Sequence, residues 1–186
     1  MKITPFALAT VCLLASLFLL PRSLHADDLR PGDLQITVQR ERPTGKLHPT
    51  TLSKNSVQIA SSEEDLHYKV TVRNGSIKSA PAATAKYIIF VHRQQLGEKD
   101  KPGEFEKIKG TASLDAIASN GNASFVTDNV TLKKQGVVVS WYYPNGGLTK
   151  AQDSIEGIWV KIMDGDKMIG ELKSPTTLNK KCVWED

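Results

Sequence analysis

The sequence predicts an all-β fold, arranged as a sandwich of short antiparallel strands. Several segments alternate apolar and polar residues with a period of two, most clearly over residues 66–73. Turn-forming dipeptides such as Asn74-Gly75 and Asn120-Gly121 separate these segments at regular intervals. The helical pattern, with apolar residues at i, i+3 and i+4, is almost absent. Together these observations predict about eight or nine strands in a sandwich, with a barrel as the less favoured alternative.

The first half of the domain begins with an alternating strand at 34–38. Pro43, Gly45 and Pro49 predict a loop over residues 41–55. A short strand is expected at 57–59. The segment 66–73 is the clearest strand, and Asn74-Gly75 should end it because both residues tolerate positive φ. Residues 83–91 follow, and their apolar run Tyr87–Val91 predicts a central strand that is covered on both faces.

The second half has weaker patterns and one clear hairpin. The charged segment 94–104 reads as a loop, and Leu148–Ser154 as a single helical turn. Asp164-Gly165 lies between two alternating segments and predicts a tight hairpin. Pro175 should stop the last strand and leave a polar tail. The remaining strands are expected at 105–109, 113–117, 123–126, 129–132, 137–143, 158–163 and 167–172.

The first 26 residues are typical of a cleavable secretory signal. Lys2 precedes an apolar run from Phe6 to Leu20, and Ala26 supplies a small residue for cleavage. The run is shorter than the roughly 20 residues of a membrane-spanning helix, although an uncleaved anchor remains the alternative. We therefore predict a signal peptide at 1–26 and one β domain at 27–186. The mature form should have no stable membrane span and should be periplasmic, exposed on the outer surface or secreted.

Charge gives little support for nucleic-acid binding. The chain has 24 basic and 20 acidic residues, and two of the basic ones, Lys2 and Arg22, lie in the predicted signal. The mature domain is thus close to neutral, and no cluster of Lys and Arg with interleaved aromatics is visible. We expect no nucleic-acid partner.

Cysteine use indicates a domain stabilised by packing. Of the two cysteines, Cys12 lies in the predicted signal and Cys182 lies near the end of the chain. One thiol cannot form an internal disulfide. Cys182 is therefore a free thiol, an intermolecular bridge or an incidental residue of the polar tail, which leaves homo-oligomerisation open.

Sites for catalysis and metals find weak support. His48, His67 and His92 are scattered, and no Gly-x-Ser-x-Gly motif is present. Structural zinc needs four Cys or His at close spacing. Asp164-Gly165-Asp166 could offer carboxylates to calcium, but a hairpin turn explains it. Glu63-Glu64-Asp65 reads as a solvated charged segment. We expect no catalytic residue, metal or cofactor.

Exposed aromatics are the candidate binding residues. If Trp141 and Tyr143 face the core, Tyr142 on the same strand faces solvent. Trp159 lies on the strand face opposite Ile158 and Val160. Such rings can stack on sugars or anchor a protein partner. Packing in a sandwich core is the alternative interpretation for each of them.

Three segments also match the N-glycosylation sequon, at Asn74, Asn122 and Asn129. Their use would depend on the cell having that machinery.

The segment Tyr68–Gly75, followed by Ala80–Tyr87, resembles bacterial Ig-like domains of the cell-adhesion-related (CARDB-type) family. The resemblance covers about residues 57–143. It implies an Ig-like or fibronectin-like β-sandwich on an exported protein, often in adhesion or envelope assembly, and it supplies no catalytic residues. The charged loop at 94–104 and the hairpin at 158–172 depart from the family pattern and leave the ligand open.

The sequence thus favours a non-enzymatic, exported binding or assembly module of the cell envelope or surface. Its expected partner is an envelope or surface protein, with a glycan as the alternative. A carbohydrate-binding module is the second hypothesis, and a small secreted hydrolase whose carboxylates converge only in the folded state is the third.

Overall fold

The structure, a computed structural model, describes residues 29, 32–43, 48–54, 57–97, 103–137, 150–178 and 182–185. Within these residues the fold is all-β, as predicted, and no helix has the length and apolar character needed to cross a membrane. Ten strands are present in the described part of the chain: β1 (Leu34–Glu41), β2 (His48–Lys54), β3 (Val57–Asn74), β4 (Ala83–Arg93), β5 (Glu104–Leu114), β6 (Asn122–Val126), β7 (Val130–Val137), β8 (Lys150–Gln152), β9 (Ser154–Asp164) and β10 (Lys167–Ser174).

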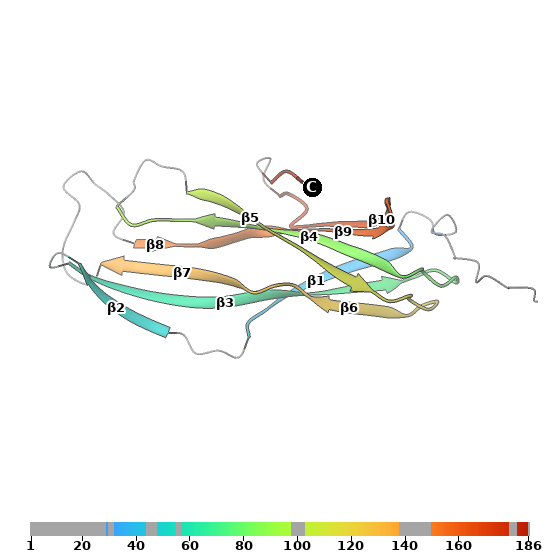
Figure 1. The fold of residues 1–186 in the computed structure, drawn as a ribbon, viewed down its shortest axis with the longest axis horizontal. Helices are drawn as coiled ribbons and strands as arrows, with labels where there is room; N and C mark the ends of the chain where they lie inside the picture. The colour runs from blue at the N-terminus through green and yellow to red at the C-terminus, as the bar shows by residue number, and fades with distance from the viewer. Residues whose placement is uncertain are drawn as a thin grey trace, which may run out of the picture.

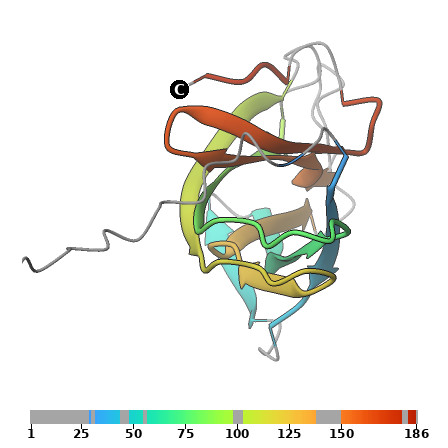
Figure 2. The ribbon, with the colours of Figure 1, turned by 90° about the vertical axis from the view of Figure 1, so that its right-hand side faces the viewer.

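The strands form two antiparallel sheets that lie face to face (Figure 1). The long strand β3 is the centre of the six-stranded sheet: β1 and β2 pair along one of its edges, β6 and β7 along the other, and β8 pairs with β7. The second sheet has the order β10-β9-β4-β5. The end-on view shows how strongly the layers curve (Figure 2). Strand β1 contacts β10 and β5 contacts β6, which partly closes the sandwich at both sides.

Strand β4 has two apolar faces, and each packs in a different cluster. All residues from Tyr87 to Val91 are buried, which confirms the predicted central strand. Ile89 faces the six-stranded sheet and packs with Val70 of β3 and Val160 of β9 in the main core. Ile88 and Phe90 face away and form a second cluster with buried Cys182. The four-stranded sheet therefore has an inner face and an outer face, and both bury apolar side chains.

Several strands are longer or placed differently than the sequence predicts. The expected strands at 57–59 and 66–73 are one strand, β3, and the one expected at 105–109 lies within β5. Of the strand expected at 113–117, only Ser113 and Leu114 belong to β5, and Ile117 forms an isolated bridge with Ala80. The loop predicted at 41–55 contains β2, which pairs with the first half of β3. The helical turn predicted at 148–154 is wrong: its described part contains β8 and the start of β9. Only Val137 of the strand predicted at 137–143 lies within the described residues.

Of the two clearest turn predictions, one is confirmed in full and the other is confirmed in position but not in backbone conformation. The hairpin at Asp164-Gly165 is confirmed, with Asp164 paired to Lys167 and Gly165 at φ +57°. Asn74 ends β3 as predicted, but it does not adopt the positive φ on which the prediction was based. The turn is held instead by hydrogen bonds from its side chain. Its Nδ2 donates to the carbonyl oxygens of Lys78, Ile117 and Ala118 at 2.7, 3.1 and 3.2 Å. The side chain is fully buried in this corner, so the sequon at Asn74 offers no accessible amide for glycosylation.

One glycine shows how closely β4 and β5 approach. Gly110 of β5 pairs with Tyr87 of β4, and a Cβ at Gly110 would overlap the tyrosine ring. The ring lies across the glycine, and its hydroxyl donates to Oδ2 of Asp128 at 3.0 Å while accepting from the Asp128 backbone N–H. Burial is the main cause of the raised pKa of Tyr87. Glycine at 110 therefore makes room for a ring that links the two sheets.

Candidate functional site

The outer face of the four-stranded sheet collects aromatic and basic side chains. Strand register places Trp159 of β9 opposite Ile88 of β4, and Lys161 opposite Lys86. On the other side of β9, Lys173 of β10 is opposite Trp159. Trp159 is half-buried and lies on the opposite strand face from the core residues Ile158 and Val160, as the alternation predicts.

Trp159 packs against a second indole from the C-terminal segment. The rings of Trp159 and Trp184 meet edge to face, with centroids 5.5 Å apart and planes at 69°. Nε1 of Trp159 donates to Oε1 of Glu171 at 2.8 Å, which satisfies the polar atom of the ring. The two rings thus form a fixed aromatic pair on a sheet surface.

Lysine ammonium groups lie over both indoles. Nζ of Lys173 is 3.8 Å from the ring centroid of Trp159, and Nζ of Lys161 is 4.2 Å from that of Trp184. Cation–π contacts of this kind contribute about 0.5–1 kcal/mol at exposed sites. We call the surface formed by Trp159, Trp184, Lys86, Lys161 and Lys173 the tryptophan–lysine face.

The C-terminal segment that carries Trp184 is packed on the sheet, which corrects the prediction of a polar tail. Cys182 is 6% exposed and lies against Ile88 and Phe90, with Leu178 at the border of the same cluster. Close approach depends on Gly157 of β9, because a Cβ there would overlap the Ser174 carbonyl oxygen and lie 2.7 Å from Cδ2 of Leu178. The segment therefore covers the outer apolar residues of β4.

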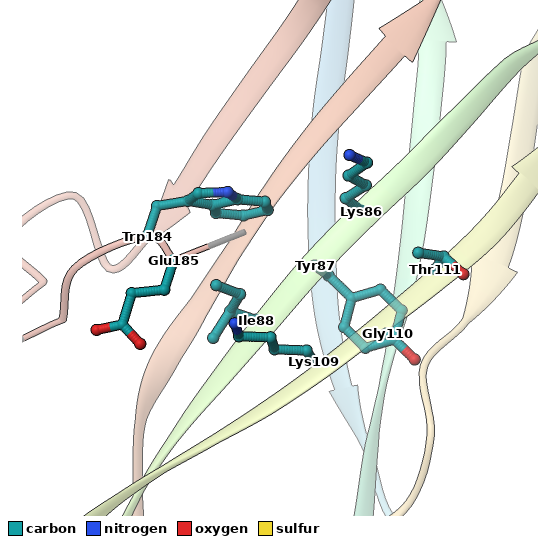
Figure 3. A pocket seen from close by; sticks show the side chains of 8 residues that line it. All are labelled: Lys86, Tyr87, Ile88, Lys109, Gly110, Thr111, Trp184 and Glu185. Carbon is teal, nitrogen blue, oxygen red and sulfur yellow. The ribbon is translucent and has the colours of Figure 1, made fainter. Parts of the chain in front are cut away.

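A cavity of about 420 Å³ opens beside Trp184 (Figure 3). The half-buried indole of Trp184 gives it apolar surface above the buried side chain of Ile88, and Lys86 and Lys109 give it positive charge. Its volume lies within the range of small-ligand sites. The lining residues come from β4, β5 and the C-terminal segment: Lys86, Tyr87, Ile88, Lys109, Gly110, Thr111, Trp184 and Glu185.

Positive charge prevails around this cavity. Lys86 and Lys161 are directly opposite each other in the β4–β9 register, an arrangement that destabilises a sheet when both carry charge. Glu185 forms an ion pair with Lys107, and a hydrogen bond from this lysine is the main reason that the pKa of Glu185 is lowered. Lys109 lowers that pKa further through its charge. The one described carboxylate in the cavity lining is thus already paired with a lysine.

A second cavity, of about 710 Å³, lies where the ends of β4, β7 and β8 meet. Its buried carboxylate, Asp153, accepts hydrogen bonds from Nη1 of Arg93 at 2.8 Å and from the backbone N–H groups of Gln94 and Lys133 at 3.1 and 3.0 Å. Arg93 also pairs with Glu106 at 2.6 Å. Asp153 thus accepts three hydrogen bonds from the protein itself, and these bonds connect β4 to β7.

The other charged groups raised by the sequence have separate partners. His67 lies 3.4 Å from Glu41 and 3.2 Å from Oδ1 of Asn129, whereas the His92 ring is tilted against Phe105. In the described residues no group of three or more His, Cys, Asp or Glu side chains could hold a metal ion.

The acidic segment of β3 does not converge on one site either. Glu63 pairs with Lys133 at 3.2 Å, Glu64 with Arg42 at 2.6 Å, and Asp65 accepts from the Thr131 hydroxyl at 2.6 Å. Each carboxylate has a different partner, which removes the main reason for considering the segment as a carboxylate pair for hydrolysis.

Of the two aromatic binding residues proposed from the sequence, the structure describes only one. Trp159 is part of the tryptophan–lysine face, whereas Tyr142 lies outside the described residues. Sequence reasoning missed Trp184, because it read the segment after Pro175 as a polar tail. The signal available was its composition: Leu178, Cys182 and Trp184 give this short segment the apolar residues of a docking strand.

Comparison with known proteins gives structural likenesses only. No family model matches the chain, and no curated protein matches it. Among solved structures, the chain is similar to Northeast Structural Genomics Consortium target SoR45, with 8% identity and a TM-score of 0.34 over 77% of this chain and 86% of that one. It is also similar to a crystal structure from Akkermansia muciniphila, with 13% identity and a TM-score of 0.28 over 85% and 80% of the two chains. These likenesses carry no conclusion about function.

Proposed function

We propose that this chain is a non-enzymatic binding module that presents the tryptophan–lysine face to a macromolecule of the cell envelope or surface. The observation that carries the proposal is the pairing of Trp159 with Trp184 on a sheet face that the second sheet does not cover. Rigid indoles bury large areas on contact while losing little conformational entropy, and they dominate many binding surfaces.

The charge arrangement of the same face supports binding over a purely structural role. Lys86 and Lys161 face each other across β4 and β9, and among the described residues none forms a hydrogen bond or ion pair with the Lys86 ammonium. Like charges at directly opposed positions cost stability. A partner that carries negative charge would remove this repulsion and gain from it.

The third hypothesis, a small hydrolase, has less support from the described groups. A catalytic carboxylate or histidine needs an open position toward substrate. Asp153 instead uses its oxygens on Arg93 and two backbone N–H groups. We therefore keep the non-enzymatic hypothesis and leave its test to a substrate screen, in which turnover abolished by a single Asp, Glu or His substitution would refute it.

A carbohydrate-binding module is the alternative that a specific observation favours. The cavity beside Trp184 combines the flat indole ring with polar groups at its border. Sugar rings present one apolar face and a rim of hydroxyls, so they match such a lining.

Export and an Ig-like relationship complete the proposal. The leader pattern at 1–26 supports secretion, and N-terminal sequencing of exported protein should find a start close to Asp27. A protein that still begins with Met1 would contradict this. Two antiparallel sheets packed face to face support the Ig-like assignment, and an experimental structure that pairs the strands in another order would replace it.

The binding proposal can be tested with paired substitutions on opposite faces of the molecule. Lys86→Glu with Lys161→Glu alters the tryptophan–lysine face, and Lys69→Glu with Arg73→Glu makes the same charge change on exposed positions of β3. Purified proteins would be applied to a glycan array and to envelope extracts. We expect the first pair to abolish binding and the second to leave it intact. Equal binding by wild type and both variants would refute the assignment of this face.

A further inference from the structure

The cavity beside Trp184 identifies a ligand class, and this inference rests on the proposed binding function. We propose that it binds an acidic saccharide, with one sugar ring on the apolar surface and its carboxylate between Lys86 and Lys109. Figure 3 shows these side chains on the neighbouring strands β4 and β5, with the Trp184 indole beside Ile88.

The size and lining of the cavity fit a ring more closely than an extended chain of phosphates. About 420 Å³ is enough for a ring or two, and the half-buried indole of Trp184 offers the apolar contact that one face of a pyranose needs. Thr111 adds a hydroxyl that can donate to or accept from the sugar hydroxyls.

The positions of the two lysines in the cavity lining indicate a ligand with a negative charge. Register pairs Lys109 with Ile88 and Lys86 with Thr111, so the two lysines are diagonal neighbours on β5 and β4. Diagonal positions on one sheet face lie roughly 7–8 Å apart. Lysine side chains are long and flexible, so ammonium groups carried by these two positions can turn toward a single carboxylate.

The negative charge of Glu185 in the cavity lining disfavours a ligand with many closely spaced negative charges. Its carboxylate lines the same cavity and is held by Lys107. A neighbouring carboxylate repels closely spaced phosphates more strongly than it repels one ligand carboxylate, and it can accept hydrogen bonds from sugar hydroxyls. The near balance of basic and acidic residues in the chain points the same way, because nucleic-acid binding requires several phosphate contacts along a basic surface. A saccharide with one carboxylate per ring fits this mixed lining.

The test uses matched ligands and matched variants. Isothermal titration would compare short oligosaccharides of galacturonic, glucuronic and mannuronic acid with their carboxyl-reduced, neutral counterparts. The protein variants are Lys86→Gln with Lys109→Gln and, as the control on the opposite sheet, Lys69→Gln with Arg73→Gln. Circular dichroism and the unfolding midpoint would show that each variant is folded.

We expect at least one acidic oligosaccharide to bind wild type about tenfold or more tightly than its neutral counterpart. The Lys86/Lys109 variant should lose that preference, while the control keeps it. Removing the ligand carboxylate and the two lysine charges together should lower the affinity little more than removing either alone, because both changes delete the same interaction. Added salt should weaken binding of the acidic ligand.

Three results would overturn the inference: equal affinity for acidic and neutral ligands, an acid preference that survives in the Lys86/Lys109 variant, or no binding of any acidic ligand. Stronger binding of a single-stranded oligonucleotide or of anionic lipid vesicles would also overturn it. If a neutral glycan or a protein binds and the Lys86/Lys161 substitutions abolish that binding, the proposed function stands and only the acidic ligand is wrong. If the Lys69/Arg73 control alone loses binding, both proposals fail.

Discussion

The inner and outer faces of the four-stranded sheet bury similar side chains but are covered in different ways. On the inner face, Ile89 and Val160 pack against β3, the central strand of the other sheet. On the outer face, Ile88 and Phe90 pack against a short segment around Cys182 and Trp184. The inner contacts belong to two full sheets, whereas the outer contacts depend on one segment near the end of the chain. We expect the inner face to determine global stability and the outer face to open locally.

An acidic residue in the inner core should have the largest effect. Ile89 is fully buried, and Ile89→Asp places an unpaired carboxylate among apolar side chains. The cost of several kcal/mol is comparable with a total stability of about 5–15 kcal/mol. We expect no soluble folded protein, by expression and circular dichroism, while Lys69→Asp on the exposed face of β3 folds normally. A cooperatively folded Ile89→Asp protein would show that the inner face is not the main core.

Filling the space under Tyr87 should destabilise the protein by a smaller amount. Gly110→Ala forces the added methyl group into the tyrosine ring, and overpacking of this kind typically costs 1–3 kcal/mol. Gly136→Ala is the matched control, because the nearest atom to its new Cβ is 3.9 Å away. Chemical denaturation should give a lower midpoint for the first variant alone. Equal midpoints would mean that the β4–β5 contact can relax without cost.

A change at Gly157 should act on the outer face. Gly157→Ala pushes on Ser174 and Leu178, and through them on the segment that buries Cys182. We expect faster labelling of Cys182 by a thiol reagent, with a smaller loss of global stability than Ile89→Asp causes. If Gly157→Ala lowers the unfolding midpoint but labelling remains slow, the outer cover and the inner core unfold as one unit.

The smallest effect should come from the ion pair between Lys107 and Glu185. Because folding lowers the pKa of Glu185 below its usual value of 4.5, this contact stabilises the docked segment above pH 4.5 and is lost as the pH falls through the folded pKa. We expect the indole N–H resonance of Trp184 to shift in that acidic range. In Glu185→Gln the shift should be absent, and an identical pH profile in both proteins would contradict the assigned contact.

The inner face could be predicted from the sequence far better than the outer one. Period-two alternation at 66–73 and the continuous apolar run Tyr87–Val91 are direct consequences of strand geometry, and they placed β3 and β4 correctly. The bounds of β3 could not be predicted, because residues 61–65 are polar and owe their strand structure to pairing with β2 and β7. The pattern at β4 also showed that something must cover Ile88 and Phe90.

The candidate site, the tryptophan–lysine face, was only half predictable. Alternation placed Trp159 on the outer face, but its contacts with Lys161, Lys173 and Trp184 depend on which strands become neighbours. A turn follows Ser174, with the N–H of Leu178 donating to the Pro175 carbonyl oxygen at 3.1 Å. Local sequence patterns do not specify where the segment that carries Trp184 docks. The close approach at Gly157 is likewise a tertiary contact, visible in the sequence only as a glycine inside a strand.

The most direct test of the account is a lysine footprint of the bound protein. Acetylation rates of individual lysines would be measured by mass spectrometry with and without the glycan or envelope component that the protein binds. We predict protection of Lys86, Lys161 and Lys173 on the tryptophan–lysine face, with unchanged rates at Lys69 and Lys134 on the six-stranded sheet. Protection confined to Lys69 and Lys134 would contradict the central claim that the outer face of the four-stranded sheet is the binding surface.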